Sequence, residues 1–413
     1  MRYVRKIVLF ALAFLSMGED VLADEWVLKG SMIQQLQYND NIAFSTTGKE
    51  SVVGYLLTPT LQANRKTEVL DIGFQGQGLI SRYDDSSWDC DNYNLGLNNA
   101  YRTRRNIFSL NGGYSVSCSY AQQVSQTGIV VPNSQATSYR LAPTWTWQWT
   151  SRDQLILSTS YAKTSYSNSG SSTASTNTTI NFSGNDTYTV NLGGNHQWSR
   201  YLSLNEKLFF SNVKYTGLNA STQNMFGFQI GANYTINHYW SISGSGGPKW
   251  VGTQQSSTSA LLGQNSSLSL GYVASINLSY TGKMSNFSTG YYNSIDPSSI
   301  GQTLQNQSVF ANYSYRLTPH LVLDINCNYL HSESIGGQST NNANSQFKRS
   351  YFTASPGINW EFNKNWRIRG SYIYRWQDYQ QDNSVPNLNV GASDVNIVMV
   401  SLNYFWDGFR SSR

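Results

Sequence analysis

The sequence predicts an all-β protein, a transmembrane antiparallel β-barrel of about 18 strands, and three observations support this fold class. Apolar and polar residues alternate with a period of two along most of the chain. The connections between these segments are, in alternation, short polar breaks and longer Ser/Thr/Asn-rich stretches. Aromatic residues reach 14% while charged residues are only 12%, where about 25% is usual. Such a mixture suits a wall with lipid on one side and water on the other.

A secretory leader precedes the predicted barrel. A basic start at residues 2–6 is followed by the apolar stretch 7–17 and by the small residues Val21 and Ala23, which suit signal peptidase. An uncleaved anchor helix is the alternative, but this stretch is far shorter than the roughly 20 residues that span a bilayer. We therefore expect residues 1–23 to be a cleaved signal peptide and residues 24–413 to be a single outer-membrane barrel domain.

The clearest predicted strand covers residues 268–280, where Leu, Tyr, Ala and Ile alternate with Ser, Gly and Asn. Residues 108–120 and 226–236 repeat the pattern. Successive side chains of a strand point to opposite faces, so each segment separates an apolar from a polar environment. We expect the apolar side chains to face lipid and the polar ones to line the lumen.

The connections between these segments predict the number of strands. Eight short turns, each with a strand on either side, and one further strand at each end of the chain predict about 18 strands with both termini in the periplasm. The sequence indicates neither a helix in the mature chain nor a plug. The short turns lie near residues 65–66, 104–105, 152–153, 199–200, 237–238, 282–283, 318–319 and 364–365, and the longer outer loops cover residues 122–134, 165–186, 254–266, 332–346 and 380–392.

Aromatic residues cluster beside the short turns, where amphipathic rings would sit at the headgroup layer. The last strand, around residues 398–406, ends in aromatic residues and must pair with the first strand, around residues 26–38, to close the barrel. We expect outer-membrane lipid, lipopolysaccharide and the barrel-insertion machinery as partners. The clustered aromatic residues are Trp145, Trp147, Trp149, Trp198, Tyr201, Tyr239, Trp240, Trp360 and Trp366.

Three cysteines are too few for a disulfide framework or a zinc site. If the strands around Arg104 form a hairpin, residues whose numbers sum to about 208 lie opposite each other, which pairs Cys90 with Cys118. We therefore predict a Cys90–Cys118 disulfide at the outer rim, formed in the oxidising periplasm. Cys327 falls at a lipid-facing position and serves as a small apolar residue.

Two motifs carry a family resemblance. The run YNDNI at residues 38–42, after the first strand, and the run LTPTL at residues 57–61 occur in this order, and related Pro-containing units return at residues 142–145 and 355–358. In these features the sequence resembles the second group of outer-membrane β-barrel porins. The resemblance covers the mature chain in architecture but only about a dozen residues in motif. It implies an outer-membrane barrel, sometimes found alongside exopolysaccharide systems, with no defined substrate and no catalytic residues.

The structural interpretation of these motifs needs no ligand. Asp40 and Asn41 suit the start of an outer loop, because their side chains hydrogen-bond nearby backbone. A calcium-binding role for Asp40 is the alternative. Proline within a strand removes a hydrogen-bond donor and favours a local bend in the wall.

The predicted lumen is more positive than negative, and we expect it to prefer anions weakly. Arg367, Arg369 and Arg375 on one strand, with Arg349 on its neighbour, would form a basic ladder. Alternatively, these arginines pair with luminal carboxylates or with inward loops. The inward cations are Lys29, Arg102, Arg140, Lys207, Lys249, Arg316, Arg349, Arg367, Arg369 and Arg375, and the inward carboxylates are Asp71, Asp324 and Glu361.

Among function classes, a porin-like channel for passive diffusion of small hydrophilic solutes fits best, because barrels of this size enclose an aqueous channel. The alternative is a barrel linked to exopolysaccharide export or surface interaction without an open pore. Catalysis is not expected, since four histidines occur without a nucleophile motif. No cofactor, metal site or nucleic-acid partner is predicted, since the net charge of +5 forms no basic block. The sequence leaves the oligomeric state open.

Overall fold

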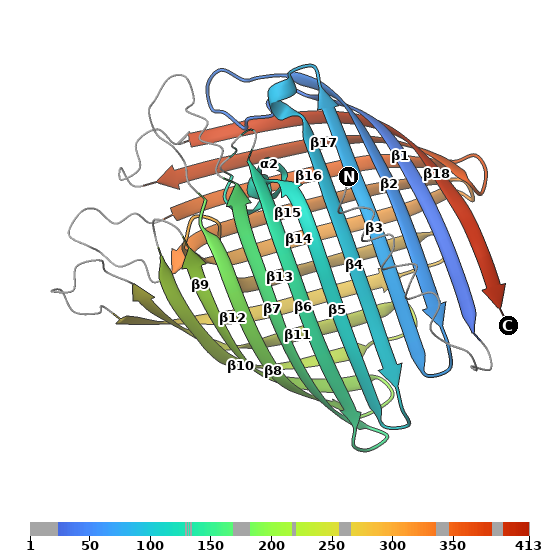
Figure 1. Cartoon of the computed structure of the whole chain (residues 1–413), viewed down its shortest axis with the longest axis vertical. Helices are drawn as coiled ribbons and strands as arrows, with labels where there is room; N and C mark the ends of the chain where they lie inside the picture. Colours follow the sequence, from blue (N-terminus) through green and yellow to red (C-terminus); the bar gives the residue numbers. More distant parts are fainter. Residues whose placement is uncertain are drawn as a thin grey trace, which may run out of the picture.

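The computed structural model describes one closed barrel (Figure 1). Its 18 strands form a single antiparallel sheet, and the ring is complete because β1 pairs with both β2 and β18. The predicted fold class and strand number are therefore confirmed. The described residues are 24–128, 130, 132, 134–167, 182–216, 220–255, 266–335, 347–381 and 391–412.

The predicted signal peptide, residues 1–23, lies outside the described residues, as do most of the predicted outer loops. Strands follow one another around the ring in chain order. No helix in the described part of the chain is long and apolar enough to cross a membrane. The strands are β1 Glu25–Asn39, β2 Val52–Lys66, β3 Leu70–Tyr83, β4 Cys90–Arg102, β5 Asn106–Cys118, β6 Gln135–Gln148, β7 Asp153–Ser167, β8 Gly184–Gln197, β9 Leu202–Thr216, β10 Ser221–Thr235, β11 Trp240–Gln255, β12 Ser266–Thr281, β13 Ser285–Pro297, β14 Thr303–Thr318, β15 Leu321–Ile335, β16 Phe347–Glu361, β17 Trp366–Gln381 and β18 Gly391–Ser412.

The outer wall of the barrel is apolar. On β12, Leu268 and Leu270 are 69% and 68% exposed, and Ile276 on the same face is also exposed. Exposing so continuous an apolar surface to water would be unfavourable, whereas the acyl chains of a membrane can cover it. The closed ring also leaves no strand edge unpaired in the membrane. The chain is therefore an integral, multi-pass β-barrel of the outer-membrane type.

Six of the eight short turns share one hydrogen bond. In these six, a Ser, Thr or Asn side chain accepts a hydrogen bond from the backbone N–H three residues later, which stabilises a tight reversal of the chain. For example, Thr67 Oγ1 accepts from Leu70 and Asn237 Oδ1 accepts from Trp240, both at 2.9 Å. The polar breaks seen in the sequence are thus the turns themselves. Further residues with this role are Thr103, Thr150, Ser199 and Asn363.

Aromatic rings mark this turn-bearing end. Trp145, Trp147 and Trp149 stack in a row with ring centroids 6.4 and 6.0 Å apart, and Trp149 and Trp198 are among the most exposed residues of the wall. Rings with an apolar body and a polar edge favour the headgroup layer. Their position at the short turns agrees with the predicted girdle on the periplasmic side.

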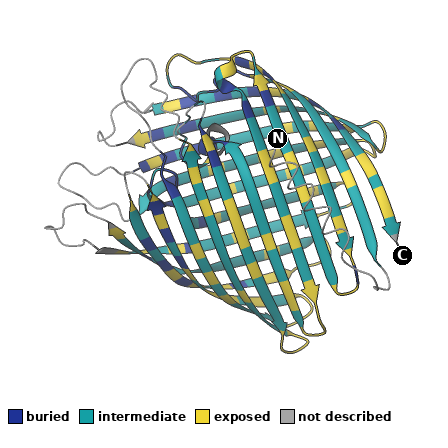
Figure 2. Cartoon of the chain, viewed as in Figure 1, coloured by how far each residue is buried: buried dark blue, intermediate teal, exposed yellow. Residues whose placement is uncertain are grey.

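The sequence indicated no helix and no plug, but two short helices are present and part of the chain folds into the lumen. A short helix, α2, covers Ser119–Gln126, and a 3-10 helix, η1, covers Ser86–Trp88. Figure 2 shows that the buried residues gather near the loop-bearing end of the barrel, where α2 also lies in Figure 1. The strand pattern could not predict this, since a loop's direction depends on what it packs against.

Candidate functional site

The first inward segment is α2, which directly follows β5. Val124 on α2 is buried in a cluster with Phe44 from the β1–β2 loop, Tyr351 on β16, and Val395 and Ile397 on β18. These contacts bring parts of the chain that are far apart in sequence together inside the barrel. The outer end of the lumen therefore contains a small hydrophobic core, held by apolar burial as in a soluble domain.

Arg349 holds the end of α2 in place. Its guanidinium donates to the carbonyl oxygens of Val124 at 2.6 Å and Ser125 at 3.3 Å, and to Gln377 Oε1 at 3.1 Å, and it lies 4.6 Å from the ring centroid of Tyr351. The last carbonyls of a helix lack partners within it, and a cation there is favourable. Arg349 is only 1% exposed. Its assignment as a pore-lining residue of the basic ladder is therefore corrected.

A second inward segment, residues 298–302 between β13 and β14, approaches from across the barrel. Ser299 Oγ donates to Gln123 Oε1 of α2 at 2.7 Å, and the Ser299 carbonyl accepts from the Ser183 N–H at 2.7 Å. The Tyr215 hydroxyl donates to the Gln302 carbonyl at 3.0 Å. Because β5 and β14 lie on opposite sides of the ring, these bonds bridge the outer mouth.

Lys249 on β11 anchors the approach to this second segment. Its Nζ donates to the Ile295 carbonyl at 2.5 Å. Ile295 is buried with Val213, Met225 and Val251 from the strands of that wall. Lys249 therefore faces inward as predicted, but it positions the end of β13 instead of standing free in the channel.

The YNDNI motif attaches the β1–β2 loop to the barrel at the outer mouth. Asp40 accepts from the Asn396 N–H and Nδ2, both at 2.7 Å. Asn41 is fully buried and donates to the Ser45 carbonyl at 2.9 Å and the Asp394 carbonyl at 3.1 Å. Asp40 and Asn41 thus attach the loop to β18. No cluster suited to a metal ion occurs in the described part of the chain.

An ion pair adds to this attachment at the exposed rim. Lys49 Nζ lies 2.8 Å from Asp394 Oδ1. The hydrogen bond from Asp394 raises the pKa of the Lys49 ammonium above its ordinary value of 10.5. Since both groups are exposed, the pair contributes little to stability.

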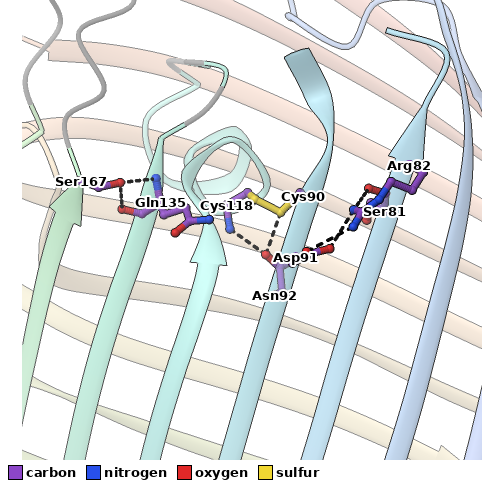
Figure 3. The surroundings of a disulfide bond; sticks show 8 residues. All are labelled: Ser81, Arg82, Cys90, Asp91, Asn92, Cys118, Gln135 and Ser167. Carbon is purple, nitrogen blue, oxygen red and sulfur yellow. Dashed lines mark hydrogen bonds and ion pairs between the residues drawn. A yellow bond between two sulfur atoms is a disulfide. The ribbon is translucent and has the colours of Figure 1, made fainter. Parts of the chain in front are cut away.

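The predicted disulfide is present between the start of β4 and the end of β5. Cys90 and Cys118 are bonded, with their Cα atoms 6.2 Å apart. Figure 3 shows Asn92 beside the bond, where its Oδ1 accepts from the Cys118 N–H at 2.7 Å. The hairpin register differs by one residue from the predicted one, since Tyr93 pairs with Val116. Because α2 begins directly after Cys118, the disulfide fixes the point from which the helix enters the lumen.

The periplasmic half of the lumen is polar and more open. Arg369 forms an ion pair with Asp324 at 2.8 Å and a hydrogen bond with Asn359 at 3.3 Å, and Arg367 lies 3.5 Å from Glu361. A pocket of about 500 Å³ lies at this wall, lined in part by Asp324, Asn359 and Arg369. Two of the three arginines predicted on β17 are therefore neutralised by carboxylates.

Three other predicted arginines keep their charge uncompensated. Arg140, Arg316 and Arg375 lie on β6, β14 and β17 and face the lumen by register, opposite Gly113, Val322 and Thr353 respectively. The guanidinium of none of the three has a hydrogen bond or an ion pair with another described residue. They are the free cations of the predicted set of pore-lining candidates.

The sequence reasoning missed Gln123, Ser299 and Phe44, which connect the inward segments. One signal was present, since residues 119–126 read SYAQQVSQ and break the alternation that precedes them. Phe44 has a φ of 58°, a conformation that is uncommon for a bulky residue. Nothing in a strand pattern predicts the contact between Gln123 and Ser299, because it joins opposite sides of the ring.

No protein-family model and no curated protein matches this chain. Several solved structures are similar to it. Pseudomonas aeruginosa OccK2 (OpdF) in complex with glucuronate is 10% identical, with a TM-score of 0.47 over 92% of this chain and 98% of that chain. Acinetobacter baumannii OccAB4 is 12% identical, with a TM-score of 0.47 over 94% and 98%. The ferric citrate transporter FecA in its unliganded form is 9% identical, with a TM-score of 0.49 over 92% and 78%.

Proposed function

We propose that this barrel is a channel for passive diffusion of small hydrophilic solutes across the outer membrane, with a weak preference for anions. The charge balance of the open lumen carries the proposal. The carboxylates of Asp324 and Glu361 are paired with arginines, whereas Arg140, Arg316 and Arg375 have no such partner within the described structure. Asp71 on β3, the third inward carboxylate, forms no ion pair with a described residue either, so the uncompensated charge of these groups is three positive against one negative.

Two physical arguments connect this charge to transport. An 18-stranded barrel is wide enough to enclose water as well as side chains. Fixed cations on a low-dielectric wall raise the local concentration of anions and lower that of cations. The bridge formed by α2 and residues 298–302 narrows the outer mouth, which favours small solutes over large ones.

Planar bilayer recording tests the proposal. The purified barrel should conduct, and in a KCl gradient its reversal potential should have the sign of chloride preference. A reversal potential of the opposite sign would refute the anion preference but would still support a channel. A barrel that inserts but does not conduct would refute the channel itself.

One observation favours the alternative, a barrel linked to exopolysaccharide export or surface interaction without an open pore. Three segments, the β1–β2 loop, α2 and residues 298–302, are attached to one another or to the wall at the outer mouth. If these attachments close the lumen, the wild-type barrel is silent. A variant with α2 released would then conduct, which distinguishes a closed barrel from a denatured preparation.

A further inference from the structure

The apolar outer wall carries a carboxylate between exposed leucines. Glu206 on β9 is exposed and lies on the same face as Leu204 and Leu208. Its neighbours across the sheet are Gly194 on β8 and Ile230 on β10. Within the described chain the Glu206 carboxylate has no hydrogen bond and no ion pair. A carboxylate that faces acyl chains is unfavourable, so this position calls for a partner that a single barrel does not supply.

A second unpartnered polar group faces outward on β4, five strands away along the ring. Asn99 lies between Leu97 and Tyr101 on the lipid-facing side, and its neighbours across the sheet are Ile72 and Leu110. Its side-chain amide has no hydrogen bond with another residue that the structure describes. Asn99 borders a groove of about 420 Å³ whose lining includes Tyr101, Leu110, Pro143, Trp145 and Leu157.

The two groups lie at nearly the same depth in the membrane. Asn99 is three residues before the end of β4 at Arg102, and Glu206 is four residues after the start of β9 at Leu202. Both strand ends adjoin short turns on the periplasmic side. At a rise of about 3.3 Å per residue along tilted strands, the difference in depth is only a few ångströms. Copies of a barrel with the same orientation in the membrane are related by an axis along the membrane normal. Rotation about this axis keeps the depth of every residue, so two residues that meet between copies must lie at equal depth.

The surfaces around the two groups complement each other. Beside Glu206, Leu208 and Ile230 are 58% and 62% exposed and project from the outer wall of β9 and β10, and we call these aliphatic side chains the β9–β10 ridge. The groove beside Asn99 is apolar along most of its lining. A ridge of aliphatic side chains with a central carboxylate therefore matches an apolar groove with an amide donor at its border.

We propose that a second copy of this chain is the missing partner. The β9–β10 ridge of one copy packs into the β4–β7 groove of the next, and Glu206 accepts a hydrogen bond from Asn99 of the neighbouring copy. A twofold pair through the ridge would place Glu206 against Glu206, which is unfavourable. Because the two surfaces differ and lie five of 18 strand positions apart, the contact is head-to-tail and closes into a ring of at least three copies.

Site-directed cross-linking tests this arrangement in native outer membranes. With Cys327 replaced by alanine, the variants Asn99→Cys and Glu206→Cys are made singly and together, and a short bismaleimide is used because it leaves the Cys90–Cys118 disulfide intact. The double variant should give cross-linked dimers and higher species. A matched control combines Asn99→Cys with Ile358→Cys, which is exposed on the opposite wall and also lies three residues from the end of its strand. Cross-linking of Glu206→Cys with itself, or equal cross-linking in the control, would overturn the head-to-tail contact.

Two substitutions at Glu206 separate a protein partner from lipid. If Glu206 meets Asn99 of a neighbouring copy, Glu206→Leu should lower the fraction of oligomer about tenfold, and Glu206→Gln, which keeps an acceptor, should retain most of it. Native mass spectrometry gives both fractions. If Glu206 meets lipid alone, Glu206→Leu raises the melting temperature and the wild-type barrel stays monomeric, which overturns the inference. A wild-type barrel that is monomeric but conducts would contradict the oligomer and would not contradict the proposed channel.

Discussion

Arg349, near the outer end of β16, and Arg369, near the periplasmic end of β17, both point into the barrel, but their surroundings differ. Arg349 is buried under α2 and donates to backbone carbonyls, whereas Arg369 stands at a polar wall and pairs with Asp324. The lumen around Arg349 is thus packed like the core of a soluble protein, whereas the wall around Arg369 is polar. A cation on the inward face supports structure in the first setting and contributes to the electric potential in the second.

The largest expected effect comes from removing the anchor of α2. Arg349→Ala deletes the donors to Val124 and Ser125 and opens space under the helix, which weakens its docking by about 3 kcal/mol. We expect single-channel conductance to rise several-fold and added protease to cleave near α2. Arg316→Ala is the matched control, since this exposed arginine has no contact with the inward segments. Unchanged conductance in Arg349→Ala would show that α2 does not limit the pore.

The next effect concerns the point at which α2 enters the lumen. Replacing Cys90 and Cys118 by serine removes a cross-link between residues 28 positions apart, which should lower the free energy of unfolding by about 3 kcal/mol. The temperature at which the folded barrel loses its fast migration on unboiled gels measures this change. A double variant that unfolds like the wild type would mean that the hydrogen bonds and packing of α2 suffice without the disulfide.

A smaller effect, on selectivity alone, is expected from the free cations of the lumen. Replacing Arg375 and Arg316 by glutamine removes two free cations without disturbing a described contact, so the ratio of chloride to potassium permeability should fall roughly twofold. Conductance and stability should barely change. Reversal potentials in a KCl gradient give the ratio. Arg369→Gln serves as the contrast, because it frees Asp324 but changes the luminal charge by one unit where the double variant changes it by two, so it should shift the ratio less. A rise in the ratio would show that Arg375 and Arg316 are not the source of the anion preference.

The smallest effect is expected at the rim. Lys49→Met removes the ion pair with Asp394 and should cost at most about 1 kcal/mol. Since the folded pKa of Lys49 is raised, the pair's contribution is present below 10.5 and is lost only as the pH rises through the raised value. Protease cleavage of the β1–β2 loop should therefore be the same at pH 7 and pH 9. A marked increase at pH 9 would indicate that another group controls this loop.

Period-two alternation, tight polar breaks and the position of the aromatic residues were enough to predict the barrel and its 18 strands. These features are local: each depends on a strand and its turn, and pairing with the next strand follows from chain order. Cys90 and Cys118 could be paired for the same reason, since one hairpin connects them.

Only the tertiary structure decided which inward residues meet water. The burial of Arg349, the role of Lys249 and the contact between Gln123 and Ser299 depend on segments that come from different sides of the ring. Alternation specifies the side of the wall from which a residue projects. It does not specify what folds over that residue, because the packing of a loop is determined by shape and hydrogen bonding with parts of the chain that are distant in sequence.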